Sequence, residues 1–482
     1  MKRLLGALLT LLCFFILDCA LAEEETTRRA LLIGCDTFIS HENTAPSASL
    51  NIERMARMLQ SDARPYASIM RMDTGVASLE RLRSALETAF SAAQAGDVSL
   101  IYICTHGLYD RITREPSLVL SDGKTEETVS AAQLRALLDT IPGQKVLLID
   151  ACNSGAFIGK GVWDPSLANS FASPDYKVLT SAGANESSFL WRSSDLGGSY
   201  FAEELCDGLR SHRYDLNADG TITLNEAYQC LLENHGISTA HVYPQADDFP
   251  LYIYDSAQSP VVDGPLSELL LDTPVLDNGE DTLYFSFTVR RAVRVYYQII
   301  YYRSGQWWFN APQIIADDEN SGGALSPGRK ERSVTLVSED DAPYGYVLLQ
   351  LITQEGRYTL LSGSRLIAVQ PSAGDPRLSI WCAPSFAPRT GEELSIYVRH
   401  QFPCSLSVTI CDNAGNAVRR LAYKVPSRPL GSTQEGSFFY WDGKDSDGQY
   451  VPAGEYTISV SCRIGDQNYE QQSGLISIGS QQ

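Results

Sequence analysis

The sequence has little positive charge. Lys and Arg number 38 against 58 Asp and Glu in 482 residues, which gives a formal net charge of -20. A protein that binds a nucleic-acid backbone needs a basic surface to neutralise phosphates, so we expect no nucleic-acid partner. The excess of carboxylates favours solubility and attracts cationic groups, but it identifies no particular partner.

Long apolar runs are missing after residue 22, so no transmembrane helix is predicted in the rest of the chain. The N-terminus has two basic residues at positions 2–3, an apolar run over 4–17 and Ala-Leu-Ala at 20–22. This order is typical of a secretory signal peptide, which predicts an exported protein whose signal peptide is residues 1–22. Lipoprotein anchoring at Cys19 is the alternative, although Asp18 is a poor residue before a lipidated cysteine.

Closely spaced cysteine pairs are also absent. No CxxC motif occurs, which removes the common zinc-binding arrangements. Nine cysteines follow the predicted signal peptide (11 in the chain minus Cys13 and Cys19), and they are scattered along the chain. An odd number leaves at least one cysteine without a disulfide partner, and the cysteine with a free thiol has to be identified from other features of the sequence.

Apolar residues make up 44% of the chain and aromatic residues 10%, enough for packed cores. At about 150 residues per domain, the length predicts about three domains. From residue 27 to 257, short apolar runs alternate with segments of helical periodicity, which is typical of an α/β domain with a mostly parallel sheet and helices on both faces. The predicted strands are Ala30–Gly34, Ser68–Met72, Val98–Cys104, Lys145–Asp150, Tyr176–Ser181 and Pro250–Tyr254. The predicted helices are Ala48–Leu59, Leu79–Ala93, Ala131–Leu138, Tyr200–Leu209 and Leu224–Leu232, and Ser130 with Gln133 forms a capping box for the third.

Helical periodicity ends after a polar linker near residues 256–264. Strand-like runs separated by turn residues then continue over 265–371 and again over 376–478. Several short strands at such spacing predict two all-β sandwich modules of immunoglobulin-like type after the α/β domain.

Two predicted strands end on reactive side chains. His106 and Gly107 follow the strand Val98–Cys104, and Cys152 follows the strand Lys145–Asp150. Because the carboxyl ends of parallel strands lie at one edge of the sheet, we expect an imidazole base next to a thiol nucleophile. The backbone N–H groups of Gly107 and Cys152 would form an oxyanion hole. The alternative for Cys152 is a small buried apolar residue, which is the usual role of cysteine.

These segments resemble the caspase-like clan of cysteine peptidases, which includes caspases, metacaspases, legumains, clostripain and gingipains. The matching segments, in the family's order, are Ala30–Gly34, Thr105–Gly107, Asp150–Gly155, Leu179–Ser188 and Gly197–Phe201. The resemblance implies a cysteine endopeptidase with His106 and Cys152 as its dyad. The chain departs from the common Ser-Gly-His-Gly at Cys104 and Thr105, and at Asn153, where His or Arg is usual.

The resemblance also suggests a specificity pocket. In metacaspases an acidic residue in the position of Asp150 lines the pocket for the residue before the cleaved bond. By similarity, Asp150 would select Arg or Lys, and Glu186 or Asp195 would share the role. The alternative is that Asp150 only orients the loop through hydrogen bonds to the backbone.

A twelve-residue segment from Asp215 to Glu226 fits a calcium-binding loop. The predicted oxygen ligands are Asp215, Asn217, Asp219, the Thr221 carbonyl, Thr223 directly or through water, and Glu226. Gly220 provides the sharp turn that such a loop requires. We therefore expect structural or activating Ca²⁺ and no organic cofactor, the alternative being a loop that binds too weakly to matter.

The segment Tyr440–Ile458 resembles the immunoglobulin-like module of the flagellar hook-assembly family. The sequence thus predicts an exported cysteine endopeptidase that acts on proteins or peptides, with β modules that either attach it to a cell surface or envelope or restrict access to it. Two alternatives remain: a transpeptidase or ligase that uses the same dyad, and a non-catalytic adhesion or scaffold protein.

Overall fold

The computed structural model describes residues 26–479, except for short gaps at 41–47, 165, 189, 194–195, 235–237, 256, 258, 262–263, 278–281, 304–305, 318–322, 337–344, 356–357 and 429–435. The predicted signal peptide, Cys19 and Asp195 lie outside the described residues. In the described part, no helix combines the length and the apolar composition needed to cross a bilayer.

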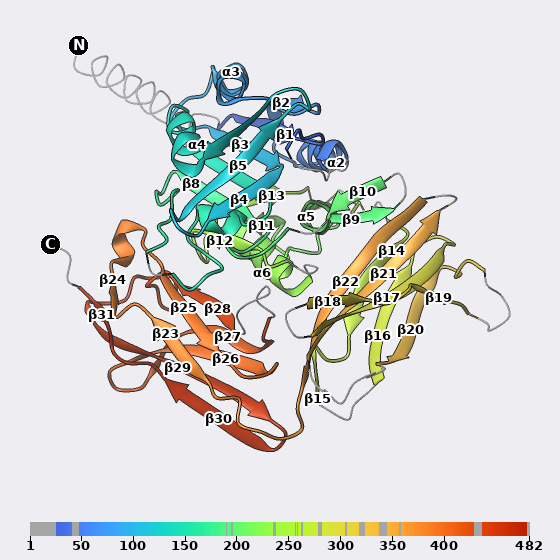
Figure 1. Ribbon diagram of the computed structural model, residues 1–482, viewed down its shortest axis with the longest axis vertical. Coiled ribbons are helices and arrows are strands. Elements are labelled where there is room, and N and C mark those ends of the chain that lie inside the picture. The colour runs from blue at the N-terminus through green and yellow to red at the C-terminus, as the bar shows by residue number, and fades with distance from the viewer. Residues whose placement is uncertain are drawn as a thin grey trace, which may run out of the picture.

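A six-stranded sheet forms the centre of the N-terminal domain (Figure 1). Its strands, in spatial order, are β12 (His241–Tyr243), β8 (Tyr176–Thr180), β7 (Gln144–Asp150), β3 (Val98–Cys104), β1 (Arg28–Gly34) and β2 (Tyr66–Met72). Five strands are parallel, and only β12 at one edge is antiparallel. The predicted mostly parallel sheet is therefore confirmed.

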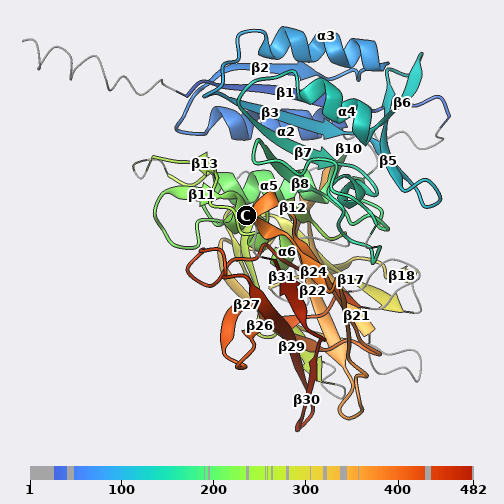
Figure 2. The ribbon, with the colours of Figure 1, turned by 90° about the vertical axis from the view of Figure 1, so that its left-hand side faces the viewer.

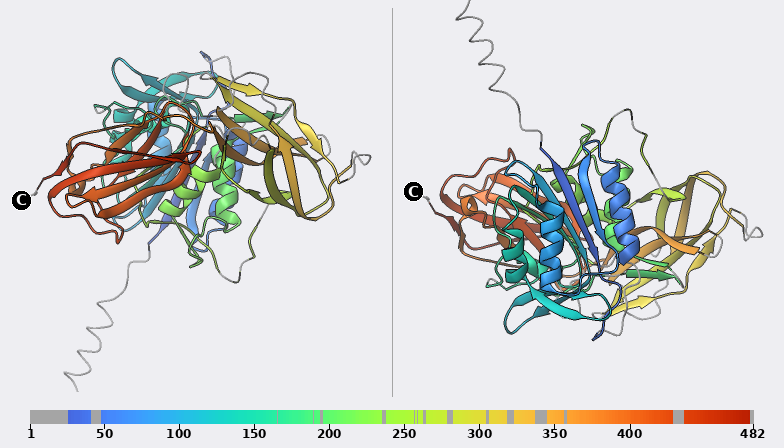
Figure 3. Two further views of the ribbon diagram at one scale, coloured as in Figure 1. Left: turned by 90° about the horizontal axis from the view of Figure 1, so that it is seen from below. Right: turned by 90° about the horizontal axis from the view of Figure 1, so that it is seen from above.

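Five helices cover the sheet on its two faces (Figure 3). They are α2 (Ala48–Gln60), α3 (Leu79–Phe90), α4 (Ala131–Leu138), α5 (Tyr200–Arg210) and α6 (Leu224–Asn234). Alternate residues of β3 point to opposite faces, so Leu100 and Tyr102 pack with α2, α5 and α6, whereas Ile101 and Ile103 pack with α3 and α4. Both faces are buried, which explains why the strand is apolar throughout. The capping box predicted for α4 is present.

A second, three-stranded antiparallel sheet was not predicted. It consists of β4 (His106–Asp110), β5 (Glu115–Ser121) and β6 (Glu126–Ser130). It begins one residue after β3 ends, and Leu118 and Leu120 of its middle strand pack into the core that contains α3 and α4. The sheet therefore carries the predicted base His106 on its first strand.

The remaining elements of the domain are short. They are the 3-10 helix Ser154–Phe157 and the strands β9 (Leu190–Ser193), β10 (Leu196–Ser199), β11 (Thr221–Thr223) and β13 (Pro250–Ile253). The run predicted at Pro250–Tyr254 forms β13, but it pairs with β11 and lies outside the main sheet. A short strand can pair with any exposed edge, and its sequence does not specify which one.

The middle module packs two sheets face to face. The smaller sheet has β14 (Leu266–Leu271), β16 (Thr282–Val289) and β20 (Gly328–Thr335). The larger has β15 (Val275–Asp277), β22 (Tyr358–Gln370), β21 (Gly345–Glu355), β17 (Arg294–Arg303), β18 (Gln306–Phe309) and β19 (Gln313–Ile315).

The C-terminal module is a second sandwich. Its smaller sheet has β23 (Ser379–Cys382), β25 (Leu394–Arg399) and β28 (Ser437–Trp441). Its larger sheet has β24 (Ser385–Phe386), β31 (Ile476–Ile478), β29 (Gly454–Ile464), β26 (Ser405–Asp412), β27 (Ala417–Pro426) and β30 (Gln467–Gln472). A 3-10 helix, Pro388–Thr390, precedes β25. The α/β domain followed by two β sandwiches is the predicted fold class.

Both modules lie on the same side of the N-terminal domain and contact it (Figure 2). The Tyr440 hydroxyl accepts a 2.9 Å hydrogen bond from the Gly161 N–H, and Lys160 Nζ lies 2.5 Å from Glu393 Oε2 with both side chains buried. Burial lowers the pKa of Lys160, although the Glu393 charge opposes the shift. In the middle module, Gln350 donates a 2.8 Å bond to the Tyr200 hydroxyl.

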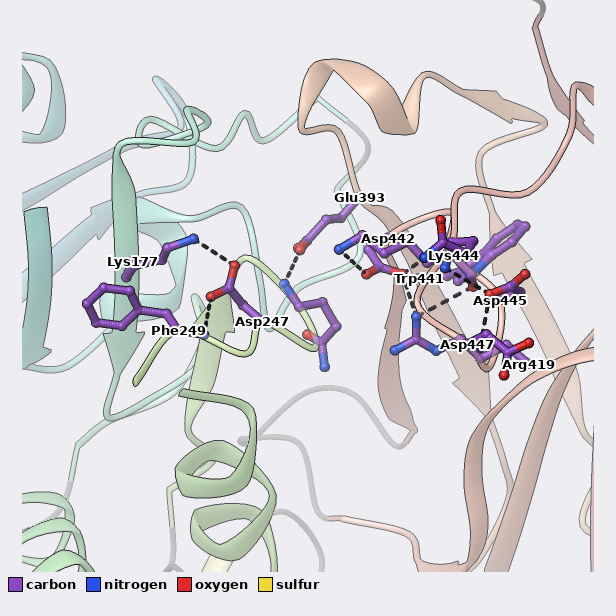
Figure 4. Close-up of polar contacts among 12 residues, drawn as sticks. Lys177, Asp247, Phe249, Glu393, Arg419, Trp441, Asp442, Lys444, Asp445 and Asp447 are labelled. Atoms are coloured by element: carbon purple, nitrogen blue, oxygen red, sulfur yellow. Dashed lines mark hydrogen bonds and ion pairs between the residues drawn. The ribbon is translucent and has the colours of Figure 1, made fainter. Parts of the chain in front are cut away.

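Figure 4 shows Glu393 extending from the C-terminal module toward the loop of the N-terminal domain that contains Asp247. Asp247 accepts a 2.6 Å bond from Lys177 of β8. In the same view Asp442, which directly follows β28, lies 2.8 Å from Arg419 and 3.6 Å from Lys444. The Asp442 carboxylate is therefore used in ion pairs within the C-terminal module.

Candidate active site

The ends of β3 and β7 are neighbours in the sheet. Cys104 at the end of β3 is in register with Asp150 at the end of β7. The segment after β3 remains hydrogen-bonded to the end of β7, because the Thr105 N–H donates a 3.2 Å hydrogen bond to the Asp150 carbonyl. The residues that follow, His106 with Gly107 and Cys152, therefore leave the sheet at one edge.

Gly107 is in direct contact with the backbone of Cys152. A Cβ atom added at Gly107 would lie 1.9 Å from the Cys152 carbonyl oxygen and 3.0 Å from its carbonyl carbon. Any side chain would therefore push the two strand ends apart. The glycine after His106 is needed so that the segments carrying the base and the thiol can approach each other.

His106 is held by an aromatic contact that the sequence did not indicate. It is half-buried on β4, where it pairs with Val119 of β5. Its ring centroid lies 4.3 Å from that of Phe38, with the planes tilted by 54°. Phe38 belongs to a small buried cluster with Cys35 and Val119, which packs beside the imidazole. This packing restricts the orientation of the ring.

Cys152 is half-buried, and its thiol donates a 3.8 Å hydrogen bond to the Ser188 carbonyl. Burial raises the pKa of the Cys152 thiol above its usual value, although the interaction with Ser188 lowers it in part. The nearby Asp150 charge also raises it. The resting thiol is thus protonated at neutral pH, and it needs a base to become a nucleophile.

The residue after Cys152 has an unusual backbone. Asn153 has φ 58° and ψ 14°, in the left-handed region that asparagine tolerates better than most residues. Its N–H donates to the Glu186 carbonyl and its side-chain amide to the Ala184 carbonyl, both at 2.8 Å. This turn directs the chain from β7 into the 3-10 helix and leaves Cys152 at the edge of the sheet.

Asp150 lies beneath this edge and is only 3% exposed. Its carboxylate accepts a 2.9 Å bond from the Tyr102 hydroxyl and a 3.3 Å bond from the Ser188 hydroxyl. Burial raises its pKa, against the lowering effect of hydrogen bonds from Ser199, Tyr102 and other hydroxyls. No described Arg, Lys or His forms an ion pair with it. Asp150 is thus a desolvated acid two residues from the thiol.

Glu186 has a different environment. Its carboxylate accepts 2.9 Å bonds from the N–H groups of Gly183 and Thr239 and a 3.2 Å bond from the Thr239 hydroxyl. Burial raises its pKa, although the two backbone bonds and the charge of Arg428 oppose the shift. Glu186 thus joins the segment behind Cys152 to the residues just before β12.

The segment Asp215–Glu226, predicted to bind calcium, turns sharply at Gly220. Gly220 adopts φ 86°, and its N–H donates a 2.9 Å bond to Asp215. The Glu226 carboxylate accepts bonds from the N–H groups of Leu216, at 3.1 Å, and Thr223, at 2.9 Å. Strand β11 and helix α6 start within the loop. The chain therefore turns as such a loop requires.

The side chains of this loop make hydrogen bonds among themselves. Asn217 donates a 3.0 Å bond to Asp219, and Tyr254 donates a 2.6 Å bond to Asp215. Desolvation tends to raise the pKa of Asp215, but the bonds from Tyr254 and from the loop N–H groups outweigh it and lower the pKa. Within the described residues, no three His, Cys, Asp or Glu side chains gather at metal-binding distance. The backbone and the oxygen donors fit Ca²⁺, which would have to draw the carboxylates together.

Two protein families match separate parts of the chain. The caspase domain matches residues 27–229, and the FlgD Ig-like domain matches residues 390–466. No curated protein matches the chain.

Solved structures are similar at low identity. Caspase-1 from Spodoptera frugiperda is 16% identical, with 46% of this chain and 89% of that chain covered and a TM-score of 0.32. Dimeric latent PorU from Porphyromonas gingivalis is 13% identical, with 50% and 22% covered and a TM-score of 0.19. The α/β domain thus contains the segment that matches the caspase domain, and the C-terminal sandwich contains the segment that matches the FlgD Ig-like domain.

Proposed function

We propose that the protein is an exported cysteine endopeptidase in which His106 and Cys152 form the catalytic dyad. One observation carries this proposal: Gly107, next to His106, touches the backbone of Cys152 at the shared edge of β3 and β7. Chemistry in α/β sheets is found at the carboxyl ends of the strands, where these two residues lie.

In the proposed reaction, His106 accepts the proton of the Cys152 thiol as the sulfur attacks the carbonyl carbon of the scissile bond. The N–H groups of Gly107 and Cys152 stabilise the oxyanion that forms. The amine departs with a proton from His106, which leaves a thioester. His106 then removes a proton from water, the hydroxide attacks the thioester, and the acid leaves while the proton returns to the Cys152 sulfur.

We propose that Asp150 selects Arg or Lys before the cleaved bond. The support is that its buried carboxylate is surrounded by hydroxyl groups and has no cationic partner in the described part of the chain. A guanidinium or ammonium group of a substrate would supply the missing charge, and such charge-assisted bonds are strong in a desolvated site.

The direct test uses residues 23–482 and fluorogenic peptides that end in Arg, Lys, Asn or Asp, with Cys152→Ala as the inactive control. We expect release of the fluorophore after Arg and Lys only, and none with the control variant. Activity that survives in Cys152→Ala would reject the proposed nucleophile. Hydrolysis after Asn or Asp would keep the peptidase but reject the role given to Asp150.

Replacing Asp150 by Ala is expected to lower kcat/KM for the Arg and Lys peptides by about 10–100-fold, because a charge-assisted bond contributes about 1.5–3 kcal/mol. The ratio of rates on basic and neutral peptides is the decisive measurement, since a purely structural role would lower both rates together. Asp466→Ala, which changes a fully exposed acid, is the matched control.

We further propose that Asp215, Asn217, Asp219, Thr221, Thr223 and Glu226 bind a Ca²⁺ ion that stabilises the domain. A single extracellular loop of this type is expected to bind Ca²⁺ with a Kd of about 10⁻⁴–10⁻³ M. Addition of 10 mM Ca²⁺ should therefore raise the Tm of the domain by about 3–10 °C, from the mass-action term and the usual unfolding entropy.

The control for calcium is Glu226→Gln, which keeps the size of the side chain and removes its charge. Because Glu226 also bonds to Leu216 and Thr223, the variant is judged by its shift with Ca²⁺ and not by its absolute Tm. Equal shifts in the two proteins, or a shift that Mg²⁺ reproduces, would reject the site.

A further inference from the structure

A cavity of about 630 Å³ lies where the three folded units meet. Its walls come from α6 and the start of β12 in the N-terminal domain, from β14 and β22 in the middle module, and from β27 and β28 in the C-terminal module. Its volume is in the range of small-molecule binding sites.

The charge of this cavity is opposite to that of the chain. Its described lining residues include five basic side chains and no acidic one, although the chain as a whole has a net charge of -20. The basic residues are Arg365, Arg419, Arg420, Lys424 and Arg428. Four of them belong to the C-terminal module and Arg365 belongs to the middle module, so docking of the two modules adds the fifth cation to the cavity.

The five cations differ in their surroundings. Arg419 is 2.8 Å from Asp442, and the charge of Arg428 acts on Glu186. Arg420 and Lys424 both lie over the ring of Tyr423, at 4.9 and 5.3 Å from its centre. Four of the five cations therefore have an aromatic neighbour in the lining or interact with an acid outside it.

A buried polar atom at the cavity gives the second observation. His241 of β12 lines the cavity, is 3% exposed, and its Nδ1 has no hydrogen-bond partner. Burial lowers the pKa of His241 to about 3, and the charges of Lys160 and Arg428 contribute, so the imidazole is neutral. A buried polar atom without a partner costs free energy that a bound ligand would recover.

We propose that this cavity, defined by Arg365, Arg428 and His241, is a binding site for a small polyanion with two or more carboxylate or phosphate groups. Arginine binds both groups through paired N–H donors. The anion neutralises cations from two modules at once and so holds the three units together. The site is separate from Cys152, and its test does not depend on catalysis.

The experiment is calorimetric titration of residues 23–482 with tripolyphosphate and, separately, with citrate at constant ionic strength. We expect saturable binding of at least one of the two and a rise in Tm on binding. Stronger binding of tripolyphosphate would identify a phosphate ligand, and stronger binding of citrate a carboxylate ligand. Failure of both to bind would overturn the proposal, and binding of hexaglutamate alone would favour an acidic peptide in its place.

Two single variants test whether one ligand spans the modules. Arg365→Gln, in the middle module, and Arg428→Gln, in the C-terminal module, should each weaken binding about tenfold or more. Arg463→Gln removes an exposed charge from the same C-terminal module and is the control. If all three variants weaken binding equally, the effect is one of general charge and the proposed site is wrong. The Tm without anion shows whether each variant is folded.

Discussion

Replacing His106 by Ala is expected to lower kcat/KM for a cleaved peptide by about 10²–10⁴-fold, the usual contribution of a positioned acid–base group. The structural reason lies in the thiol. Burial raises the pKa of Cys152, so almost no thiolate exists at neutral pH without a proton acceptor. The same imidazole has to protonate the leaving amine, so its loss affects both directions of proton transfer.

The thiol itself gives an independent measurement. The rate of alkylation of Cys152 by iodoacetamide should be low at neutral pH and should rise as the pH approaches its raised pKa, because only the thiolate reacts. Comparison with Cys152→Ala identifies the labelled site by mass. A fast reaction at pH 6 would show a depressed pKa and would contradict the proton transfer proposed for His106.

Replacing Gly107 by Ala is expected to lower kcat/KM by about 10²-fold or more, because a shift of about 1 Å in a catalytic group has an effect of this size. The added Cβ would lie 1.9 Å from the Cys152 carbonyl oxygen, so one of the two strand ends has to move. The N–H of residue 107, proposed for the oxyanion hole, would move with it.

Gly474→Ala is the matched control, since a Cβ added there meets no atom within 4 Å. Hydrolysis rates and Tm should both be measured, so that a loss of activity is separated from a loss of folded protein. Activity of Gly107→Ala within twofold of the wild type would show that contact between these strand ends is not required.

The positions of His106 and Cys152 at strand ends could be predicted because the strands are specified by residues next to them in sequence. Buried apolar runs before His106 and Cys152 indicate neighbouring parallel strands, and parallel strands end at one edge. The partners of these side chains could not be predicted in the same way. Phe38 and Ser188 reach the site through the packing of segments distant in sequence. The sheet β4–β6 was missed because a short strand that forms a local sheet looks the same as one that joins the main sheet.

The cavity between the modules also could not be predicted from the sequence. Arg365 lies on β22, Arg419, Arg420 and Lys424 lie on β27, and Arg428 follows β27, so no single element carries the whole set. Only the docking of the modules brings Arg365, Arg428 and His241 into the lining of one cavity. Sequence patterns describe single elements, whereas this site depends on three units.

The buried pair between Lys160 and Glu393 has a consequence for the order of events during synthesis. Lys160 lies shortly after Cys152 in the chain, whereas its counter-charge is translated much later, on the order of tens of seconds at about 5–20 residues per second. Until then Lys160 has no acidic partner, and burying its charge would be costly. The segment behind Cys152 can therefore reach its final packing only after Glu393 of the C-terminal module has been made, which delays the final arrangement of the proposed active site.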